Sequence, residues 1–110
     1  MDPGEKTMAF DNAVQKYDDL ALELVNENDG VTAAAEGLLV HGTIFAFRME
    51  EYLVVDVPSA RADDLVERGI AAHHEQSGRS WVRVATLELW PELAREAREF
   101  VAVPGVGGQS

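Results

Sequence analysis

The chain has 110 residues, of which 46% are hydrophobic, and it carries a formal net charge of -11. This length and composition fit one folded domain and exclude a disordered chain, while the absence of cysteine excludes disulfides and thiolate metal sites. No apolar run is long enough to cross a bilayer and residues 1–6 lack the layout of a signal peptide, so we expect a cytoplasmic protein without membrane contact.

The acidic residues are concentrated in the first third of the chain. Up to Gly37 there are nine acidic residues and only Lys6 and Lys16, whereas all seven arginines follow Leu38. An acidic surface repels the phosphate backbone, which supplies most of the non-specific affinity for nucleic acids. We therefore expect no nucleic-acid partner, and we interpret the charge as a feature that keeps a small protein in solution.

The first predicted element is an amphipathic helix that begins at Phe10. Its apolar residues recur at helical spacing and leave the acidic side chains on the opposite side. They are Phe10, Val14, Tyr17, Ala21, Leu24 and Val25. We expect Thr7 or Asp11 to cap the start of this helix and residues 28–30 (Asn-Asp-Gly) to end it, with residues 1–8 forming a flexible leader.

The next segment has the composition of strands. Residues 32–36 are predicted to form an irregular edge strand, and residues 38–41 a short apolar strand. Residues 43–49 and 52–57 are rich in β-branched and aromatic side chains and flank Glu50-Glu51. They predict an antiparallel hairpin at the centre of a sheet.

The period of two in this hairpin indicates which side chains share a face. In its first strand Phe45, Phe47 and Met49 lie together, and we expect this aromatic face to point into the core. In its second strand the apolar set lies opposite a mixed one. The apolar set is Leu53, Val55 and Val57, and the mixed set is Tyr52, Val54 and Asp56.

The remaining elements follow Pro58, which ends the strand. Ser59 is the expected N-cap of a helix that runs to Arg68, with Gly69 as its C-cap. Residues 70–74 and 79–86 predict a second hairpin, in which Val82 and Val84 face one way and Trp81 and Arg83 the other.

Trp90-Pro91 opens the last predicted helix, with proline in the tolerated first turn. Its buried stripe is predicted to contain Trp90, Leu93, Ala94, Ala97, Phe100 and Val101. On its wet side we expect Arg95 to pair with Glu92 and Glu99. Residues 104–110 are predicted to be a disordered tail.

The order of elements predicts an α+β fold. Hairpin-joined strands and intervening helices indicate a two-layer sandwich, with an antiparallel or mixed sheet of about five strands. The N-terminal, middle and C-terminal helices would pack on this sheet. We expect residues 1–103 to form one domain.

Four segments together form a recognisable pattern. They are Gly42-Thr-Ile-Phe-Ala, Leu53-Val-Val-Asp-Val-Pro-Ser-Ala-Arg-Ala-Asp-Asp-Leu-Val, Gly78-Arg-Ser-Trp-Val-Arg-Val and Trp90-Pro-Glu-Leu-Ala-Arg-Glu-Ala-Arg-Glu-Phe-Val. Over roughly residues 31–101 the chain thereby resembles the TfoX N-terminal domain family and the broader MmcQ/YjbR-like group. The resemblance implies a stand-alone α+β domain related to the N-terminal half of a bacterial competence regulator.

The chain departs from the family pattern at two places. Residues 33–37 (Ala-Ala-Ala-Glu-Gly) replace a basic residue followed by Met-Phe-Gly, and residues 56–58 (Asp-Val-Pro) replace a lysine before Leu-Pro. Both changes remove positive charge. The resemblance therefore implies a regulatory or interaction module of bacterial origin, with a nucleic-acid-associated competence or transcription regulator as the alternative.

His41, His73 and His74 are the candidate metal ligands. Adjacent histidines on a strand point to opposite faces, so His73 and His74 cannot share one ion unless the backbone is irregular there. We expect no bound metal or other cofactor, and a small-molecule or metal-binding domain remains an alternative.

No pattern predicts catalysis. Ser59 suits a helix cap, Ser77 and Ser80 suit turns, and no serine lies in Gly-x-Ser-x-Gly. The adjacent carboxylates, such as Asp18-Asp19 and Asp63-Asp64, are predicted on wet faces, where their pKa values would not be tuned for acid–base work. We expect a protein that is not an enzyme and has no catalytic residues.

One predicted sheet face combines aromatic and charged side chains, and it is the candidate partner or ligand surface. Its residues are Arg48, Tyr52, Asp56, Arg79, Trp81 and Arg83. Tryptophan and arginine dominate binding hot spots, so a protein partner or a second copy of the chain is the expected ligand. The alternative is a solvated face with cross-strand ion pairs.

Overall fold

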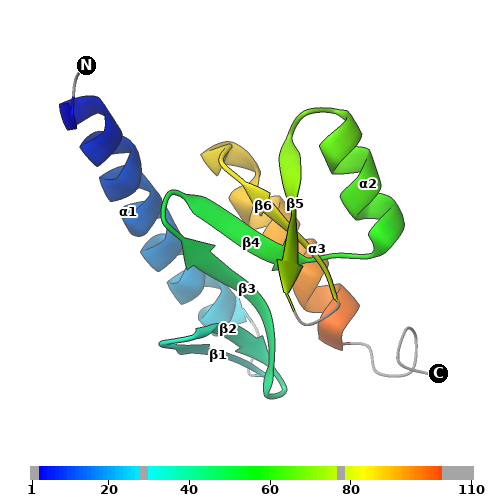
Figure 1. The fold of residues 1–110 in the computed structure, drawn as a ribbon. Coiled ribbons are helices and arrows are strands. Elements are labelled where there is room, and N and C mark those ends of the chain that lie inside the picture. Colours follow the sequence, from blue (N-terminus) through cyan, green and yellow to red (C-terminus); the bar gives the residue numbers. More distant parts are fainter. Residues whose placement is uncertain (1–2, 28–29, 77–78, 103–110) are drawn as a thin grey trace.

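The computed structural model describes residues 3–27, 30–76 and 79–102, with side chains described for residues 10–27, 30–74 and 81–102. The elements in chain order are α1 (Pro3–Glu27), β1 (Val31–Ala34), β2 (Gly37–Val40), β3 (Thr43–Met49), β4 (Tyr52–Asp56), α2 (Ser59–Glu67), β5 (Ala71–Gln76), β6 (Arg79–Val84), the 3-10 turn η1 (Leu87–Leu89) and α3 (Trp90–Ala102). Figure 1 shows their arrangement.

The described strands form one antiparallel sheet of six strands in the order β1-β2-β3-β4-β6-β5. The predicted α+β fold is confirmed, with one strand more than the sequence suggested. The central hairpin β3–β4 occupies the predicted positions, and β1 lies at the sheet edge as expected. The predicted tail at residues 104–110 lies outside the described residues.

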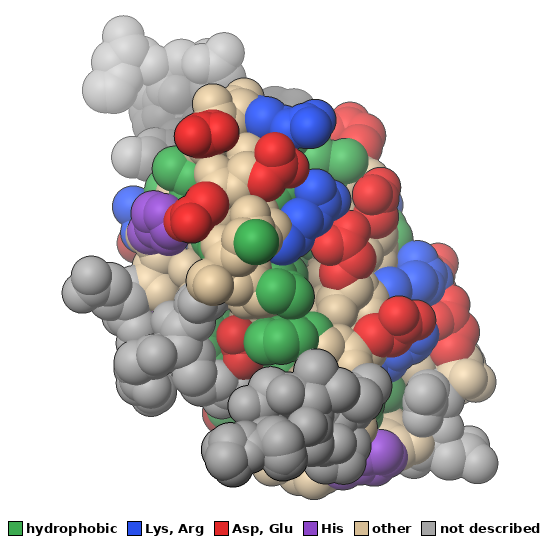
Figure 2. All heavy atoms as spheres, turned by 90° about the vertical axis from the view of Figure 1, so that its right-hand side faces the viewer, with side chains coloured by type: hydrophobic (Ala, Val, Ile, Leu, Met, Phe, Trp, Pro, Cys, Tyr) green, Lys and Arg blue, Asp and Glu red, His purple; other side chains and the backbone are tan. Residues whose placement is uncertain are grey.

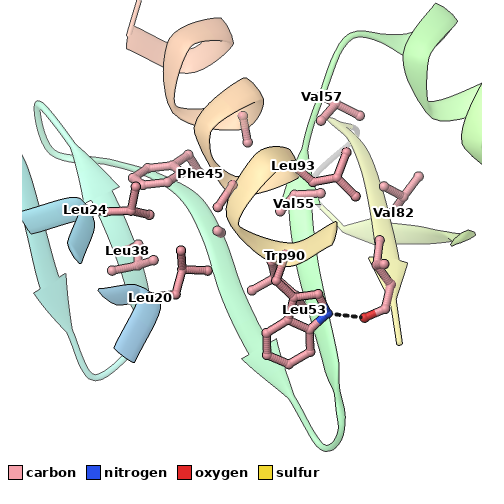
Figure 3. Close-up of a cluster of buried hydrophobic side chains, with 14 of the residues drawn as sticks. Leu20, Leu24, Leu38, Phe45, Leu53, Val55, Val57, Val82, Trp90 and Leu93 are labelled. Atoms are coloured by element: carbon pink, nitrogen blue, oxygen red, sulfur yellow. Dashed lines mark hydrogen bonds between the residues drawn. The ribbon is translucent and has the colours of Figure 1, made fainter. Parts of the chain in front are cut away.

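The helices pack on one face of the sheet and bury a single core there. Buried side chains of the core cluster come from all three helices and from the strands. Figure 3 shows α3 crossing β3 and β4, with Leu20 and Leu24 of α1 on one side and Val82 of β6 on the other. Burying a side chain the size of leucine contributes about 1.5–3 kcal/mol, so this face supplies most of the stability.

A bulge in β3 changes the faces predicted for its aromatic residues. Leu38 of β2 lies opposite Ala46, but the next residue, Leu39, lies opposite Ile44, so Phe45 is an extra residue in β3. A bulge re-aims the side chain that it carries. Phe45 and Ala46 both belong to the helix-covered core, whereas the ring of Phe47 contacts Trp81 on the other face.

The expectation that Phe45, Phe47 and Met49 share the core face is therefore wrong. It assumed an unbroken period of two, and the bulge breaks this period between Phe45 and Phe47. The predicted core faces of β4 and β6 are confirmed. Leu53, Val55, Val57, Val82 and Val84 all lie in the helix-covered core.

Two predicted helix starts are also wrong. Helix α1 begins at Pro3, so residues 3–8 are helical and both Thr7 and Asp11 lie inside the helix, where they cannot cap its start. Proline suits the first helical position because its missing N–H would have no intrahelical partner there. Helix α2 has Pro58 as its N-cap residue without a side-chain hydrogen bond, and Ser59 is its first helical residue.

The predicted end of α2 is confirmed in detail. Gly69 has a φ of 77°, which glycine adopts without steric cost. Its N–H donates to the carbonyl of Val66 at 3.0 Å, and the N–H of Ile70 donates to the carbonyl of Leu65 at 2.9 Å. These two bonds form a Schellman motif, which satisfies two carbonyls of the last turn.

Candidate functional site

The strand register brings several predicted site residues together on the sheet face away from the helices. Trp81 of β6 lies between Asp56 of β4 and His74 of β5, and Val54 lies between Phe47 and Arg83. Cross-strand neighbours project to the same side of a sheet. With Tyr52, which precedes Val54 by two, these residues form what we call the helix-free face: Phe47, Tyr52, Val54, Asp56, His74, Trp81 and Arg83.

Three rings pack edge to face at its centre. The ring centroids of Phe47 and Trp81 are 5.4 Å apart at 61°, and those of Phe47 and His74 are 6.0 Å apart at 71°. Such pairs contribute about 0.5–1.5 kcal/mol beyond the burial of their area. Trp81 is only 2% exposed, so it lies beneath the surface, and the half-buried ring of Phe47 is the aromatic group nearer to solvent.

Arg83 extends across the rim of this cluster. Its guanidinium carbon lies 6.0 Å from the centroid of the Tyr52 ring, and its Nη1 donates to the carbonyl of His73 at 3.4 Å. Contacts between a cation and an aromatic ring at this range are attractive. The half-buried Tyr52 and Arg83 therefore present a fixed cationic and aromatic edge beside the central rings.

Asp56 is the acidic member of the face. It is 4% exposed and is the one charged residue that is buried among the described side chains. Burying a carboxylate is costly unless hydrogen bonds or opposite charges compensate. Its position in β4 matches the sequence expectation that Asp56 shares a face with Tyr52, opposite Val55 and Val57.

Arg48 does not join this face. It lies opposite Leu53, a residue of the helix-covered core, and its guanidinium carbon is 5.1 Å from the centroid of the Phe10 ring in α1. Its Nη1 also donates to the carbonyl of Glu50 at 2.7 Å. The prediction for Arg48 is wrong because it assumed that Phe47 faces the core. Phe47 lies on the helix-free face, so the next residue, Arg48, lies on the side of the helices. The side chain of Arg79 lies outside the described ones.

The three histidines are separated. His73 faces the helices, with its Nε2 atom 3.6 Å from the Oδ1 atom of Asp63 in α2, whereas His74 faces the opposite side beside Phe47. His41 is an exposed residue of the β2–β3 turn with a φ of 53°. Within the described chain, no group of three or more His, Cys, Asp or Glu side chains is placed to hold a metal ion.

Displaced pKa values occur among the helices. Burial raises the pKa of the Tyr17 hydroxyl. A hydrogen bond from Arg95 lowers the pKa of Glu27, and a hydrogen bond to Glu96 raises the pKa of Arg61. The last two shifts come from ion pairs that join one helix to another, so they report helix packing.

Four arginines form ion pairs with carboxylates. Arg61 contacts Glu96 at 2.9 Å and Arg68 contacts Asp64 at 3.0 Å. Arg95 pairs with Glu23 and Glu27 of α1, and Arg98 pairs with Glu27 at 3.1 Å. The prediction that Arg95 pairs with Glu92 and Glu99 is therefore wrong. Figure 2 shows the result, because basic and acidic side chains interleave on this side of the molecule.

Sequence reasoning missed a second feature, an apolar groove of about 580 Å³ between α1 and the edge strand β1. Its lining residues are Asp18, Ala21, Leu22, Val25, Val31, Thr32 and Ala33. The available signal was Leu22, a large apolar residue on the side of the helix predicted to face water. Leu22 is 65% exposed.

Comparisons with protein-family models, with curated proteins and with solved structures give no match to this chain. None of the described helices combines the length and the apolar character needed to cross a membrane.

Proposed function

We propose that this chain is a non-enzymatic regulatory or interaction module that binds a protein partner through its helix-free face. We further propose that it is a cytoplasmic, stand-alone domain of the TfoX N-terminal type. That resemblance rests on the segments around β3, β4, β6 and α3. The antiparallel sheet with helices on one face is compatible with it.

The observation that carries the proposal is the group of half-buried side chains around the ring cluster. Phe47, Tyr52, His74 and Arg83 lie on four neighbouring strands, and their rings and guanidinium are held by contacts within pairs. Side chains that are ordered before binding lose little entropy when a partner arrives. Tyrosine and arginine are also among the residue types that dominate binding hot spots.

A protein partner fits this face better than a nucleic acid does. The net charge of the chain is -11, and Arg61, Arg68, Arg95 and Arg98 are bound to carboxylates on the other side of the sheet. Arg83 supplies positive charge on the same face as the buried Asp56. Such a mixture suits an interface with aromatic and polar contacts.

The test is a pull-down with the full chain as bait, quantified by mass spectrometry, in which Arg83→Glu and Tyr52→Ser are compared with the native chain. Arg68→Glu is the matched control, because Arg68 is the C-cap residue of α2, on the helix-covered side, and its side chain is 65% exposed. Thermal unfolding of each variant shows that it is folded. Light scattering on the same samples shows whether the partner is a second copy.

We expect a specific partner to be recovered by the native chain and by Arg68→Glu, and to be lost with Arg83→Glu and Tyr52→Ser. Equal recovery by all folded variants would count against the helix-free face as the binding site.

A further inference from the structure

The α1–β1 groove, lined by Asp18, Ala21, Leu22, Val25, Val31, Thr32 and Ala33, lies at the end of the sheet far from β5. One wall is the side of α1 that carries Leu22 and Val25, and the other is the terminal strand β1. Figure 1 shows the later turns of α1 running alongside β1 and β2. The groove is therefore an apolar channel beside an edge strand.

The hydrogen-bonding direction of β1 follows from its pairing with β2. The N–H of His41 donates to the carbonyl of Gly30 at 3.0 Å, and Val31 lies opposite Val40. In an antiparallel pair, hydrogen-bonded and non-hydrogen-bonded positions alternate. Gly30, Thr32 and Ala34 therefore point their backbone groups toward β2, and Val31 and Ala33 point theirs outward, along the free edge.

The described residues of β1 include no lysine, proline or charged side chain, which are among the groups that protect edge strands from pairing. The strand is short, with four residues, so an added strand would pair over a short length. The sequence of β1 is Val-Thr-Ala-Ala, and three of its four residues are exposed. An added strand would meet small side chains on β1 and the exposed Leu22 beside it.

The acidic side chains around the groove favour a positively charged ligand. Asp18 lines the groove, Glu36 is exposed in the adjacent turn, and none of the described residues that line it is a lysine or an arginine. A second copy of the chain would bring another net charge of -11 to this acidic edge. A positively charged segment would instead be attracted.

We propose that β1 accepts an extended, basic segment of a partner protein as an additional strand of the sheet. The main chain of the segment would pair with Val31 and Ala33. Its apolar side chains would sit on Leu22 and Val25 on one face of the added strand. Its basic side chains would project from the opposite face, where the negative net charge of the chain attracts them. This is recognition by strand addition, in which the backbone supplies affinity and alternate side chains supply specificity. It is independent of the helix-free face.

The test uses fluorescence anisotropy with a labelled peptide of alternating lysine and valine, seven residues long, and the full chain. A glutamate–valine peptide of the same length is the charge control. A lysine–glycine peptide separates charge from apolar contact. Ala33→Pro removes the outward N–H with which the added strand would pair, and it adds bulk at the edge. The fold should tolerate this change, because proline is accepted in edge strands. Leu22→Ser removes the exposed apolar contact, and Phe10→Ala is the control at an exposed position of α1 outside the groove.

We expect the lysine–valine peptide to bind at least about tenfold more tightly than either control peptide, a difference of about 1.4 kcal/mol. Ala33→Pro and Leu22→Ser should each weaken it by about the same factor, whereas Phe10→Ala and Arg83→Glu should leave it unchanged. Nuclear magnetic resonance of the native chain should show the Ala33 amide shifting on titration.

Equal affinity for the lysine and glutamate peptides, or no binding to the folded native chain, would overturn the proposal. So would a dimer in sedimentation equilibrium that Ala33→Pro converts to monomer, because the occupant would then be a second copy.

Discussion

Arg61 of α2 and Glu96 of α3 form a bidentate hydrogen bond, in which Nε donates to Oε1 at 2.9 Å and Nη2 donates to Oε2 at 3.0 Å. The two side chains are about one-third exposed, and they join helices separated by the second hairpin. A double-mutant cycle of Arg61→Ala and Glu96→Ala should give a coupling free energy of about 0.5–1 kcal/mol from urea denaturation. Arg68→Ala, on the exposed pair with Asp64, should change stability by less than about 0.5 kcal/mol. A coupling of zero would show that the helix contact is held by apolar packing alone.

The cluster of Glu27 with Arg95 and Arg98 should make stability depend on pH. The hydrogen bond from Arg95 lowers the pKa of Glu27 below its ordinary value of 4.5. Its contribution is therefore complete above pH 4.5 and is lost as the pH falls through the lower, folded pKa. Urea denaturation should show Glu27→Gln less stable than the native chain at neutral pH, with the difference shrinking below pH 4.5. A difference that is constant with pH would contradict the account.

Replacing Trp90 by an aromatic residue without a hydrogen-bond donor should destabilise the fold. Its Nε1 donates to the carbonyl of Val84 at 3.0 Å within the core (Figure 3), and the residue is fully buried. Trp90→Phe leaves this carbonyl without its donor and opens a small cavity. The free energy of unfolding should therefore fall by about 2–4 kcal/mol. Phe100→Leu, at a half-buried position of the same helix, should cost less than about 1.5 kcal/mol. Equal effects of the two substitutions in urea denaturation would argue against the hydrogen bond.

Two glycines should differ sharply in their tolerance of alanine. A Cβ added at Gly37 would lie 2.7 Å from the carbonyl oxygen of Ala46 and 2.8 Å from Cβ of Phe47, and the φ of this residue is 146°. Gly37→Ala should destabilise the fold by about 3–5 kcal/mol, because strain and overpacking add. Gly42 has a φ of 85° and open space around it, so Gly42→Ala should cost only about 1–2 kcal/mol. Thermal unfolding midpoints of the two variants measure the difference, and similar midpoints would contradict the close approach at Gly37.

Local sequence patterns were sufficient to predict features that depend on one strand or helix alone. The alternation of Leu53 and Val55 and the glycine after α2 are properties of single elements, and the structure confirms them. The stripe of α3 is confirmed from Trp90 to Ala97, whereas Phe100 is only half-buried. The bulge at Phe45 is set instead by its pairing with β2, which no local pattern records. Arg48 was misplaced for the related reason that its neighbours were assigned to the wrong side of β3.

The candidate site was predictable in its β4 and β6 members and less so elsewhere. Tyr52, Asp56, Trp81 and Arg83 share a face as expected, because unbroken alternation fixes them. Their exposure depends on what packs around them, so the burial of Trp81 between Phe47 and His74 required the fold. The partner of Arg95 was missed because Glu27 is 68 residues away in the chain.

Photo-crosslinking in the native host can show whether the helix-free face binds a protein. A photoreactive phenylalanine would replace Tyr52, with matched probes at Arg68, the C-cap residue of α2, and at Leu22 in the α1–β1 groove. We expect the probe at position 52 to crosslink to a specific protein and the probe at 68 not to do so. Binding at the groove would be reported separately by the probe at 22. A folded chain that yields no crosslink at position 52 while crosslinking from position 68 would contradict the proposed function.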